Sequence, residues 1–450
     1  MTTAKTTVNS ANGDDKLSRT QLEMIKLEKF RALARYAQQN SPYYAQIISD
    51  FGINLATCAP TDFPVLTKAI LMANYDNIVT DKRISKQVVA DFLTRSSDPK
   101  ELLFNEIIVM HTSGTSGEVG YFLYTRRDYR RMRRGAFSWR RAWRAISQIR
   151  PKRIGRMRVA FFGAIGGHYA GITGVAALQR GLLRLLVNAK AFEVNSPLPE
   201  VVTQLNQFQP GILFGYTTAL KILGEQQQQG KLHIAPSMIA ATGETVTKSD
   251  MNFLSEAFGG AKVISAYGCT EHLMLGMSNP DGDTMTLADD NLIFEFFDDH
   301  TLITNLFNYT IPLIRYSMSD ILVPISDQRA RRTVIKNRVG RSEQMPTFIN
   351  AQGATDFISP HTINEIFVRG VTRFQLQITG ASSFSFPICT ETGLTAEAKA
   401  MAVTGVETRL HEILQQKGLG NVTFEVPIVE DIPLNAHTRK FQLIIDKRAK

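Results

Sequence analysis

The chain of 450 residues has only three cysteines, Cys58, Cys269 and Cys389, and they lie far apart. An odd and widely spaced set predicts reduced thiols, and it excludes a disulfide framework or a zinc site. No apolar run reaches the ~18 residues that a membrane span needs, and residues 1–15 lack the apolar stretch of a signal peptide. We therefore expect a cytoplasmic protein with a flexible N-terminal tail over residues 1–15.

The most informative segment, residues 110–120, lacks the lysine that a P-loop would have. Residues 110–120 read MHTSGTSGEVG, with three glycines and four hydroxyl side chains after the apolar run 107–109. Glycines let the backbone approach an anion, and hydroxyl and N–H groups donate to it, so this loop can surround phosphates. No lysine follows the second glycine, which excludes the P-loop of nucleoside triphosphatases. A plain turn after a strand is the alternative interpretation.

Positive charge is concentrated in one segment. The net charge is +10, and residues 126–156 hold thirteen cations against one acid, Asp128, so the rest of the chain sums to −2. With Trp139 and Trp143 among the arginines, the pattern predicts a basic helix over 128–149. One interpretation is a solvated face whose arginine stems cover apolar surface. The other is a docking surface for an anion, such as an acidic phosphopantetheine-bearing carrier protein or coenzyme A phosphates. Nucleic acid is least favoured, because no nucleic-acid module surrounds the segment.

The order of secondary structure predicts an α/β fold. An amphipathic helix is expected over residues 17–39, ended by a turn at 41–44. From residue 158 to 267, strand-like runs alternate with helical ones, including a helix at 198–208. This alternation is typical of a doubly wound sheet, whose ligands bind at the carboxyl ends of the strands.

The pattern then changes twice. Residues 292–322 read as strands without helices, which predicts a small β subdomain. Beyond residue 340, strand-like runs such as 374–378 accompany one strong helix at 396–417. We therefore expect a large region over 16–340 and a small mobile α+β domain over 341–450.

Two strand-end segments carry groups suited to a nucleotide. Residues 266–271 read AYGCTE, where Tyr267 can stack on a purine and Glu271 can hold Mg²⁺ directly or through water. Residues 312–320 end in Asp320, which can accept hydrogen bonds from ribose hydroxyls. Taken singly, Tyr267 as a core residue and Asp320 as a turn cap are simpler interpretations.

The order of the segments is more specific than any one of them. The glycine-hydroxyl loop, Tyr-Gly-x-Thr-Glu, Arg-Tyr-x-x-x-Asp, Gly-Arg-Ser-Glu at 340–343 and Lys440 follow one another as in the adenylate-forming superfamily, which the chain resembles. Within it, the chain is most similar to phenylacetate-CoA ligases, and residues 32–44 and 63–69 also resemble that branch. The resemblance covers roughly residues 20–445.

The resemblance implies an ATP site in the large region, with a lid domain beyond it. Thr270 and Glu271 would contact the α-phosphate and Mg²⁺, and Lys440 would bridge the substrate carboxylate and the α-phosphate. Arg341 has a surface ion pair as its alternative, and Lys440 has a basic C-terminal tail. The implied ATP-binding set is Thr112, Ser113, Gly114, Thr115, Ser116, Gly117, Gly243, Glu244, Tyr267, Gly268, Asp320 and Arg341.

Two positions depart from the family pattern. Arg439 stands where a glycine usually precedes the lysine, and Glu343 stands where a hinge aspartate is usual. Glutamate keeps the charge but changes the reach, so these departures put closure of the lid domain in the thioester-forming state in doubt more than ATP binding.

An apolar and aromatic stretch predicts the acyl pocket, and such walls suit an aryl or other hydrophobic acid. A packed histidine is the commoner role for His168, and the resemblance moves it toward the substrate. The expected pocket residues are Phe162, His168, Tyr169, Gly215 and Tyr216.

Three hypotheses follow. The first is an ATP- and Mg²⁺-dependent ligase that converts a carboxylic acid to an acyl adenylate and passes it to coenzyme A or to a carrier's phosphopantetheine, without a covalent enzyme nucleophile. The second is an amide ligase with an amine acceptor. The third is a non-catalytic protein that binds nucleotide or docks a carrier. The acid, the acceptor and a homodimeric state stay open.

Overall fold

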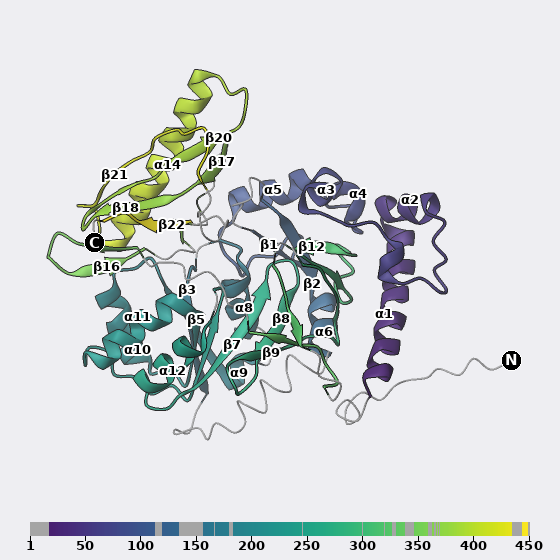
Figure 1. Cartoon of the computed structure of the whole chain (residues 1–450), viewed down its shortest axis with the longest axis horizontal. Coiled ribbons are helices and arrows are strands. Elements are labelled where there is room, and N and C mark those ends of the chain that lie inside the picture. The colour runs from purple at the N-terminus through teal and green to yellow at the C-terminus, as the bar shows by residue number, and fades with distance from the viewer. Residues whose placement is uncertain are drawn as a thin grey trace.

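The computed structural model describes residues 18–112, 119–134, 156–165, 167–179, 183–244, 246–298, 300–318, 320–325, 330–337, 346–358, 362–363, 366, 368, 370–433 and 443–448. These residues form a large α/β body with one mixed sheet, and a smaller C-terminal body of short strands beside one long helix (Figure 1). The expected α/β class is confirmed. The expected tail and the boundary at 340–341 lie outside the described residues.

The first part of the chain is helical. Ser41 caps the C-terminus of α1 and the N-terminus of α2, and Pro42 takes the first position of α2, where its missing N–H has no consequence. Helix α1 thus ends at Asn40, next to the expected end at residue 39, but residues 42–44 begin α2 instead of forming a turn. The elements are α1 (Arg19–Asn40), α2 (Pro42–Asp50), η2 (Pro60–Asp62), α3 (Lys68–Ala73), α4 (Tyr75–Ile78) and α5 (Lys86–Arg95).

A hairpin and a short helix follow. The apolar run at 107–109 is buried in β1 (Ile107–His111), which pairs antiparallel with β2 (Tyr121–Thr125). Helix α6 (Arg126–Arg134) begins directly after β2. The expected basic helix is thus described up to Arg134, and its remainder lies outside the described residues.

The central sheet has nine strands in the order β13-β14-β9-β8-β7-β6-β5-β3-β4, of which β7, β6, β5, β3 and β4 are parallel. The alternation of strands and helices expected from 158 to 267 is confirmed. Its elements are β3 (Met157–Gly163), α8 (Ala170–Leu178), α9 (Leu183–Leu186), β4 (Val187–Glu193), α10 (Leu198–Phe208), β5 (Ile212–Tyr216), α11 (Thr217–Gln228), β6 (Met238–Thr242), α12 (Lys248–Ala257) and β7 (Lys262–Cys269).

The chain changes direction across the sheet between β3 and β5. Strand β4 follows β3 on one side, whereas β5 pairs with β3 on the other side. Right-handed crossovers then place α8 on one face and α10, α11 and α12 on the other, where Figure 1 shows these three helices together. The carboxyl ends of β3 and β5 are therefore a topological switch point, the usual ligand position in such sheets.

Antiparallel strands extend the same sheet beyond β7. They are β8 (Leu273–Ser278), β9 (Thr284–Leu287), β14 (Val334–Lys336) and β13 (Pro324–Ile325). A separate three-stranded sheet contains β10 (Leu292–Phe296), β11 (Thr301–Asn305) and β12 (Tyr316–Met318). The strands expected over residues 292–322 are thus found as one small separate sheet, whereas β8, β9, β13 and β14 lie outside that range.

The C-terminal body packs helix α14 (Ala396–Lys417), which has the expected bounds, against short strands. The expected strand 374–378 is two strands, because the chain crosses at Gln375 from the β17–β20 pair to the four-stranded sheet β21-β19-β18-β22. The strands are β15 (Thr347–Ile349), β16 (Thr355–Phe357), β17 (Val371–Phe374), β18 (Leu376–Gly380), β19 (Ser383–Ser385), β20 (Ile388–Thr390), β21 (Thr423–Glu425) and β22 (Ile444–Asp446).

We expect substitution of the glycine at the switch point to lower the stability of the protein strongly. Gly215 pairs with Phe162, and a Cβ on Gly215 would lie 2.3 Å from the Phe162 carbonyl oxygen. Gly215→Ala must push β5 from β3, so we expect a loss of about 3 kcal/mol in the free energy of unfolding, measured with urea. The control is Gly174→Ala in α8, where an added Cβ meets no atom within 4 Å. It should be neutral or stabilise by up to about 1 kcal/mol, and equal effects of the two changes would contradict the argument.

Candidate functional site

The segments expected to bind ATP and acid lie at one edge of the central sheet. Gly163 ends β3, Tyr216 ends β5, Thr242 ends β6 and Cys269 ends β7. Parallel pairing of these neighbouring strands brings their carboxyl ends side by side. Residues 243–244 and 267–271, and the expected acyl-pocket residues, therefore share this edge.

The neck of the glycine-hydroxyl loop is closed by Thr112. Its amide donates to the Gly120 carbonyl at 3.0 Å, and its Oγ1 accepts from the Gly120 amide at 2.9 Å. The same Oγ1 accepts from Lys68 Nζ at 3.1 Å. Ser113, Gly114, Thr115, Ser116 and Gly117 lie outside the described residues, so their proposed contacts with phosphate stay predictions.

Lys68 is a site residue that the sequence analysis did not assign. It is the first residue of α3, and its positive charge lowers the pKa of Glu271, against the larger raising effect of burial. The ammonium thus contacts the neck of the loop through Thr112 and favours the charged form of Glu271. A signal was present, because Lys68 belongs to the segment 63–69 that resembles the phenylacetate-CoA ligase branch.

The turn after β7 is fixed to the hairpin by Tyr124. The phenol oxygen lies 2.7 Å from the Thr270 carbonyl oxygen and 2.8 Å from that of Glu271. Burial raises the pKa of Tyr124 well above its usual value, so the phenol keeps its proton and donates. Tyr124 thus sets the position of Thr270 and Glu271 relative to the loop between β1 and β2.

Glu271 is the carboxylate that the sequence analysis expects to hold Mg²⁺. Burial raises its pKa, and Lys68 and the Cys269 thiol favour its charged form. Burial likewise keeps the Cys269 thiol neutral by raising its pKa. Among the described residues, no three His, Cys, Asp or Glu side chains gather as a metal cluster. The residues fit Mg²⁺ only if phosphate oxygens and water complete its coordination, as is common for this ion.

Tyr267 and Asp320 are brought into direct contact. The Tyr267 phenol donates to Asp320 Oδ2 at 2.7 Å, although one residue belongs to β7 and the other follows β12. Both are half-buried. The ring expected to stack on adenine therefore lies beside the carboxylate expected to hold the ribose. Gly268, next to Tyr267, allows the hairpin to close, because a Cβ there would lie 2.5 Å from the Leu273 carbonyl oxygen.

Glu244 has a structural partner. Its carboxylate accepts from the Thr218 amide at 2.7 Å and from the Thr218 hydroxyl at 2.6 Å, which caps the N-terminus of α11. Gly243, just before it, has a positive φ of 78°. The carboxylate thus fastens the end of β6 to α11, and contact of this segment with adenine, which stays a prediction, would fall to the main chain.

The acyl-pocket segment meets the glycine-hydroxyl loop at His111. The His111 amide donates to the His168 carbonyl at 3.2 Å, and the rings of His111 and Tyr169 are 4.5 Å apart. Tyr216 at the end of β5 packs edge-on to Phe161. His111 is a second residue that the sequence analysis did not assign. It joins the expected phosphate end of the site to the expected acyl end.

Phe162 and His168 face packed interior. Phe162 is fully buried in β3, and His168 is 1% exposed with its ring 5.0 Å from that of Phe92 in α5. His168 Nε2 has no hydrogen-bond partner in the described part of the chain, and burial lowers the pKa of this imidazole. A neutral packed histidine is therefore the arrangement found here, and contact of His168 with the acid stays a prediction.

His168→Phe distinguishes packing from substrate contact. Burial lowers the pKa of His168 in the folded protein, so the unfolded chain, whose histidine titrates near about pH 6.5, takes up this proton more readily. Stability should thus fall below that pH by up to about 1.4 kcal/mol per pH unit from this group, and His168→Phe should remove that part. Urea unfolding at pH 5 and pH 7.5 measures it, with His233→Phe at an exposed position as the unaffected control. A changed acid preference with an unchanged pH dependence would show substrate contact instead.

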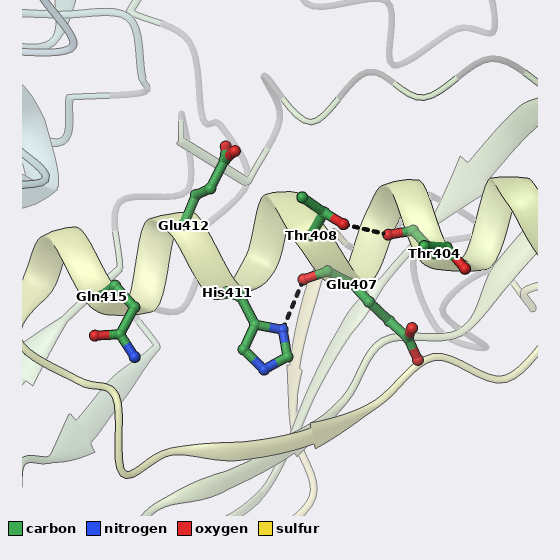
Figure 2. Close-up of a pocket in the computed structure, with 6 residues that line it drawn as sticks. All are labelled: Thr404, Glu407, Thr408, His411, Glu412 and Gln415. Atoms are coloured by element: carbon green, nitrogen blue, oxygen red, sulfur yellow. Dashed lines mark hydrogen bonds between the residues drawn. The ribbon is translucent and has the colours of Figure 1, made fainter.

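Two hollows lie elsewhere on the surface. One, of about 460 Å³, is lined by Tyr36, Asn105, Glu106, Thr125, Arg126, Arg127, Asp128, Arg130, Arg131, Tyr309 and Thr310. The other, of about 530 Å³, follows one face of α14, where Figure 2 shows His411 and Thr408 bonded to carbonyls of their own helix. Neither contains a residue expected to bind ATP.

The chain was compared with known proteins by sequence and by structure. No family model matches the chain. Protein CapK from Staphylococcus aureus is 22% identical, over 77% of this chain and 75% of CapK.

In the described residues no helix is both long and apolar enough to cross a membrane.

The structural likeness is to 2-hydroxyisobutyryl-CoA ligase. Its complex with 2-HIB-AMP and CoA in the thioesterification state has a TM-score of 0.57 at 19% identity, over 96% of this chain and 91% of that one. An open conformation with the same ligands has a TM-score of 0.52 at 18% identity, over 94% and 91%. At these identities the likeness establishes that the two proteins share a fold.

Proposed function

We propose that the chain is an ATP-dependent acid–thiol ligase of the adenylate-forming type, similar to phenylacetate-CoA ligases. The observation that carries this proposal is the junction that Tyr124 makes between the loop hairpin and the turn with Thr270 and Glu271. Tyr267 and Asp320 meet beside it, and we propose that a hydrophobic acid binds at the switch point next to it. The fold shared with a CoA ligase whose structures hold an acyl-AMP and CoA supports the proposal.

In the first step, a carboxylate oxygen attacks the α-phosphorus of ATP. The new C–O–P linkage forms as the bond from the α-phosphorus to the bridging oxygen breaks, and pyrophosphate leaves with that electron pair. Attack of one anion on another needs fixed positive charge and alignment. Lys68 supplies charge at the neck of the loop, and Lys440 is proposed to bridge the two reacting groups. Mg²⁺, when held by Glu271, supplies further charge at the phosphates.

In the second step, a thiol attacks the acyl carbonyl carbon, AMP leaves with the oxygen, and the thiol proton passes to solvent. Arg341, Glu343 and Lys440 lie outside the described residues, so their roles are proposals from the resemblance alone. We further propose that the present arrangement of the two bodies belongs to this second step; the TM-score is 0.57 with the thioesterification-state structure and 0.52 with the open conformation.

Acid-dependent exchange of pyrophosphate into ATP tests the proposed activation. We expect exchange with a member of a panel of aryl and fatty acids, and a loss of at least about a hundredfold in Lys440→Ala, because a positioned charge contributes on this scale. Transfer from pre-made acyl adenylate should survive in this variant. Lys447→Ala, in the same basic tail, is the matched control and should keep exchange. ATP binding without exchange for any acid would favour a non-catalytic nucleotide-binding protein, and turnover only with amines would favour an amide ligase.

For the acceptor, we propose an acidic carrier protein that docks on the arginines of α6. Arg126, Arg127 and Arg130 are exposed, and no ion pair involves them in the described part of the chain. Asp128 does not neutralise them, because its buried carboxylate already accepts from Thr125, Arg131, Tyr309 and Thr310. The pairing of β1 with β2 places α6 at the opposite end of the hairpin from the loop. A carrier bearing its thiol on a flexible arm can dock at such a distance.

Charge reversal tests this surface. Arg126→Glu, Arg127→Glu and Arg130→Glu together should raise the KM for an acidic carrier on the order of tenfold or more, because repulsion replaces attraction, with the KM for ATP unchanged. The control reverses three exposed cations elsewhere, Arg19, Lys231 and Lys262, for the same change in net charge. An unchanged KM for the carrier would leave these arginines as a solvated face.

A further inference from the structure

A fully buried lysine lies where the C-terminal body meets the large body. Lys417, the last residue of α14, has a side chain that is 0% exposed. Its Nζ is 3.0 Å from Asp356 Oδ1 and donates to the Ser196 carbonyl at 3.1 Å, and it lies 4.2 Å from the centre of the Phe357 ring. A buried ammonium without such partners would strongly destabilise the folded protein. These contacts therefore offset the cost of removing the Lys417 charge from water.

Asp356 also makes a hydrogen bond between the two bodies. It lies in β16 of the C-terminal body, and its Oδ2 accepts from the amide of Leu198 in the large body at 3.1 Å. Leu198 begins α10, whose N-cap residue, Pro197, has no side-chain group to accept that bond. The cap of a large-body helix is therefore supplied by the C-terminal body, where a carboxylate also interacts favourably with the helix dipole.

Neighbouring contacts reinforce the junction. Thr362 donates to Asn195 Oδ1 at 2.6 Å, and both side chains are buried. Phe357 packs into the apolar core of the large body. The segment of the large body that receives the hydrogen bonds of Lys417, Asp356 and Thr362 is short, since it runs from the end of β4 to the start of α10.

This segment leads directly to the expected acyl pocket. The Glu193 carboxylate, whose charged form the positive charge of Lys417 favours, accepts from the Asn195 amide at 3.1 Å and from the Ile165 amide at 3.0 Å. Ile165 lies in the loop between β3 and Tyr169. Contact with the C-terminal body is therefore passed, through Glu193, to the loop that carries His168 and Tyr169.

We propose that Lys417 and Asp356 are positioning residues that hold the C-terminal body in its acyl-transfer arrangement and, through Glu193, fix the acyl-pocket loop. The inference rests on the proposed function for its kinetic part only. When the bodies separate, Lys417 and Asp356 stay on one body and become hydrated, while the Ser196 carbonyl and the Leu198 amide lose their partners. The junction thus distinguishes the two arrangements energetically.

The structural part is tested by Lys417→Met, with Lys399→Met on the same helix as control. We expect the radius of gyration from small-angle scattering to increase in Lys417→Met and cleavage between the bodies by a protease to become at least tenfold faster. Asn195→Ala with Thr362→Val weakens the junction without leaving a buried charge, and it should shift both measurements in the same direction. Unchanged scattering and proteolysis in both variants would overturn the proposal, whether or not the protein is a ligase.

The kinetic part compares the two half-reactions. In both variants, transfer from pre-made acyl adenylate to the thiol should fall about tenfold, while acid-dependent pyrophosphate exchange changes less than twofold. A disulfide between Asn195→Cys and Thr362→Cys should do the reverse, because it holds the bodies together: exchange stops, transfer continues, and reduction restores exchange. Equal loss of both half-reactions would remove the positioning role. Absence of any exchange in the wild type would instead reject the proposed function and leave the scattering result standing.

Discussion

The candidate site depends on the buried phenol of Tyr124, which joins two separately built parts of the large body. One part is the β1–β2 hairpin, which carries the glycine-hydroxyl loop, and the other is the turn that follows β7. Two carbonyl groups accept from one hydroxyl, so the turn is held in position along the hairpin as well as close to it. Lys68 adds a charge between the same parts. A nucleotide placed between them would meet donors on one side and a carboxylate on the other.

The second constraint is the parallel ladder of the central sheet. It places the ends of β3, β5, β6 and β7 in a row, so that segments scattered over a hundred residues face one edge. The close approach of β5 to β3 at Gly215 keeps this edge compact at the switch point. His111 then links the row to the hairpin through His168 and Tyr169.

Burial gives similar side chains different roles. Asp128 and Asp356 are buried carboxylates used to hold elements together, whereas Glu271 is a carboxylate whose charged form the positive charge of Lys68 favours against the effect of burial. Glu244 and His168 show the same effect, since their places in the fold give them a helix cap and a packed ring as partners. Residue type alone therefore does not separate a ligand-binding group from a structural one, because desolvation and available partners decide it.

The fold class, the bounds of two helices and several candidate site residues were predictable from the sequence, because they depend on local sequence patterns. Alternating strands and helices predicted the α/β class, and periodicity gave helices 198–208 and 396–417 their observed bounds. The order of motifs indicated Tyr267, Glu271 and Asp320, and composition located the arginine cluster. The tertiary structure alone decided the contact of Tyr267 with Asp320, the places of Lys68, His111 and Tyr124, and the junction of Lys417 with Asp356. These depend on pairing between residues distant in the chain, and no local preference encodes which distant partner a buried polar group will find.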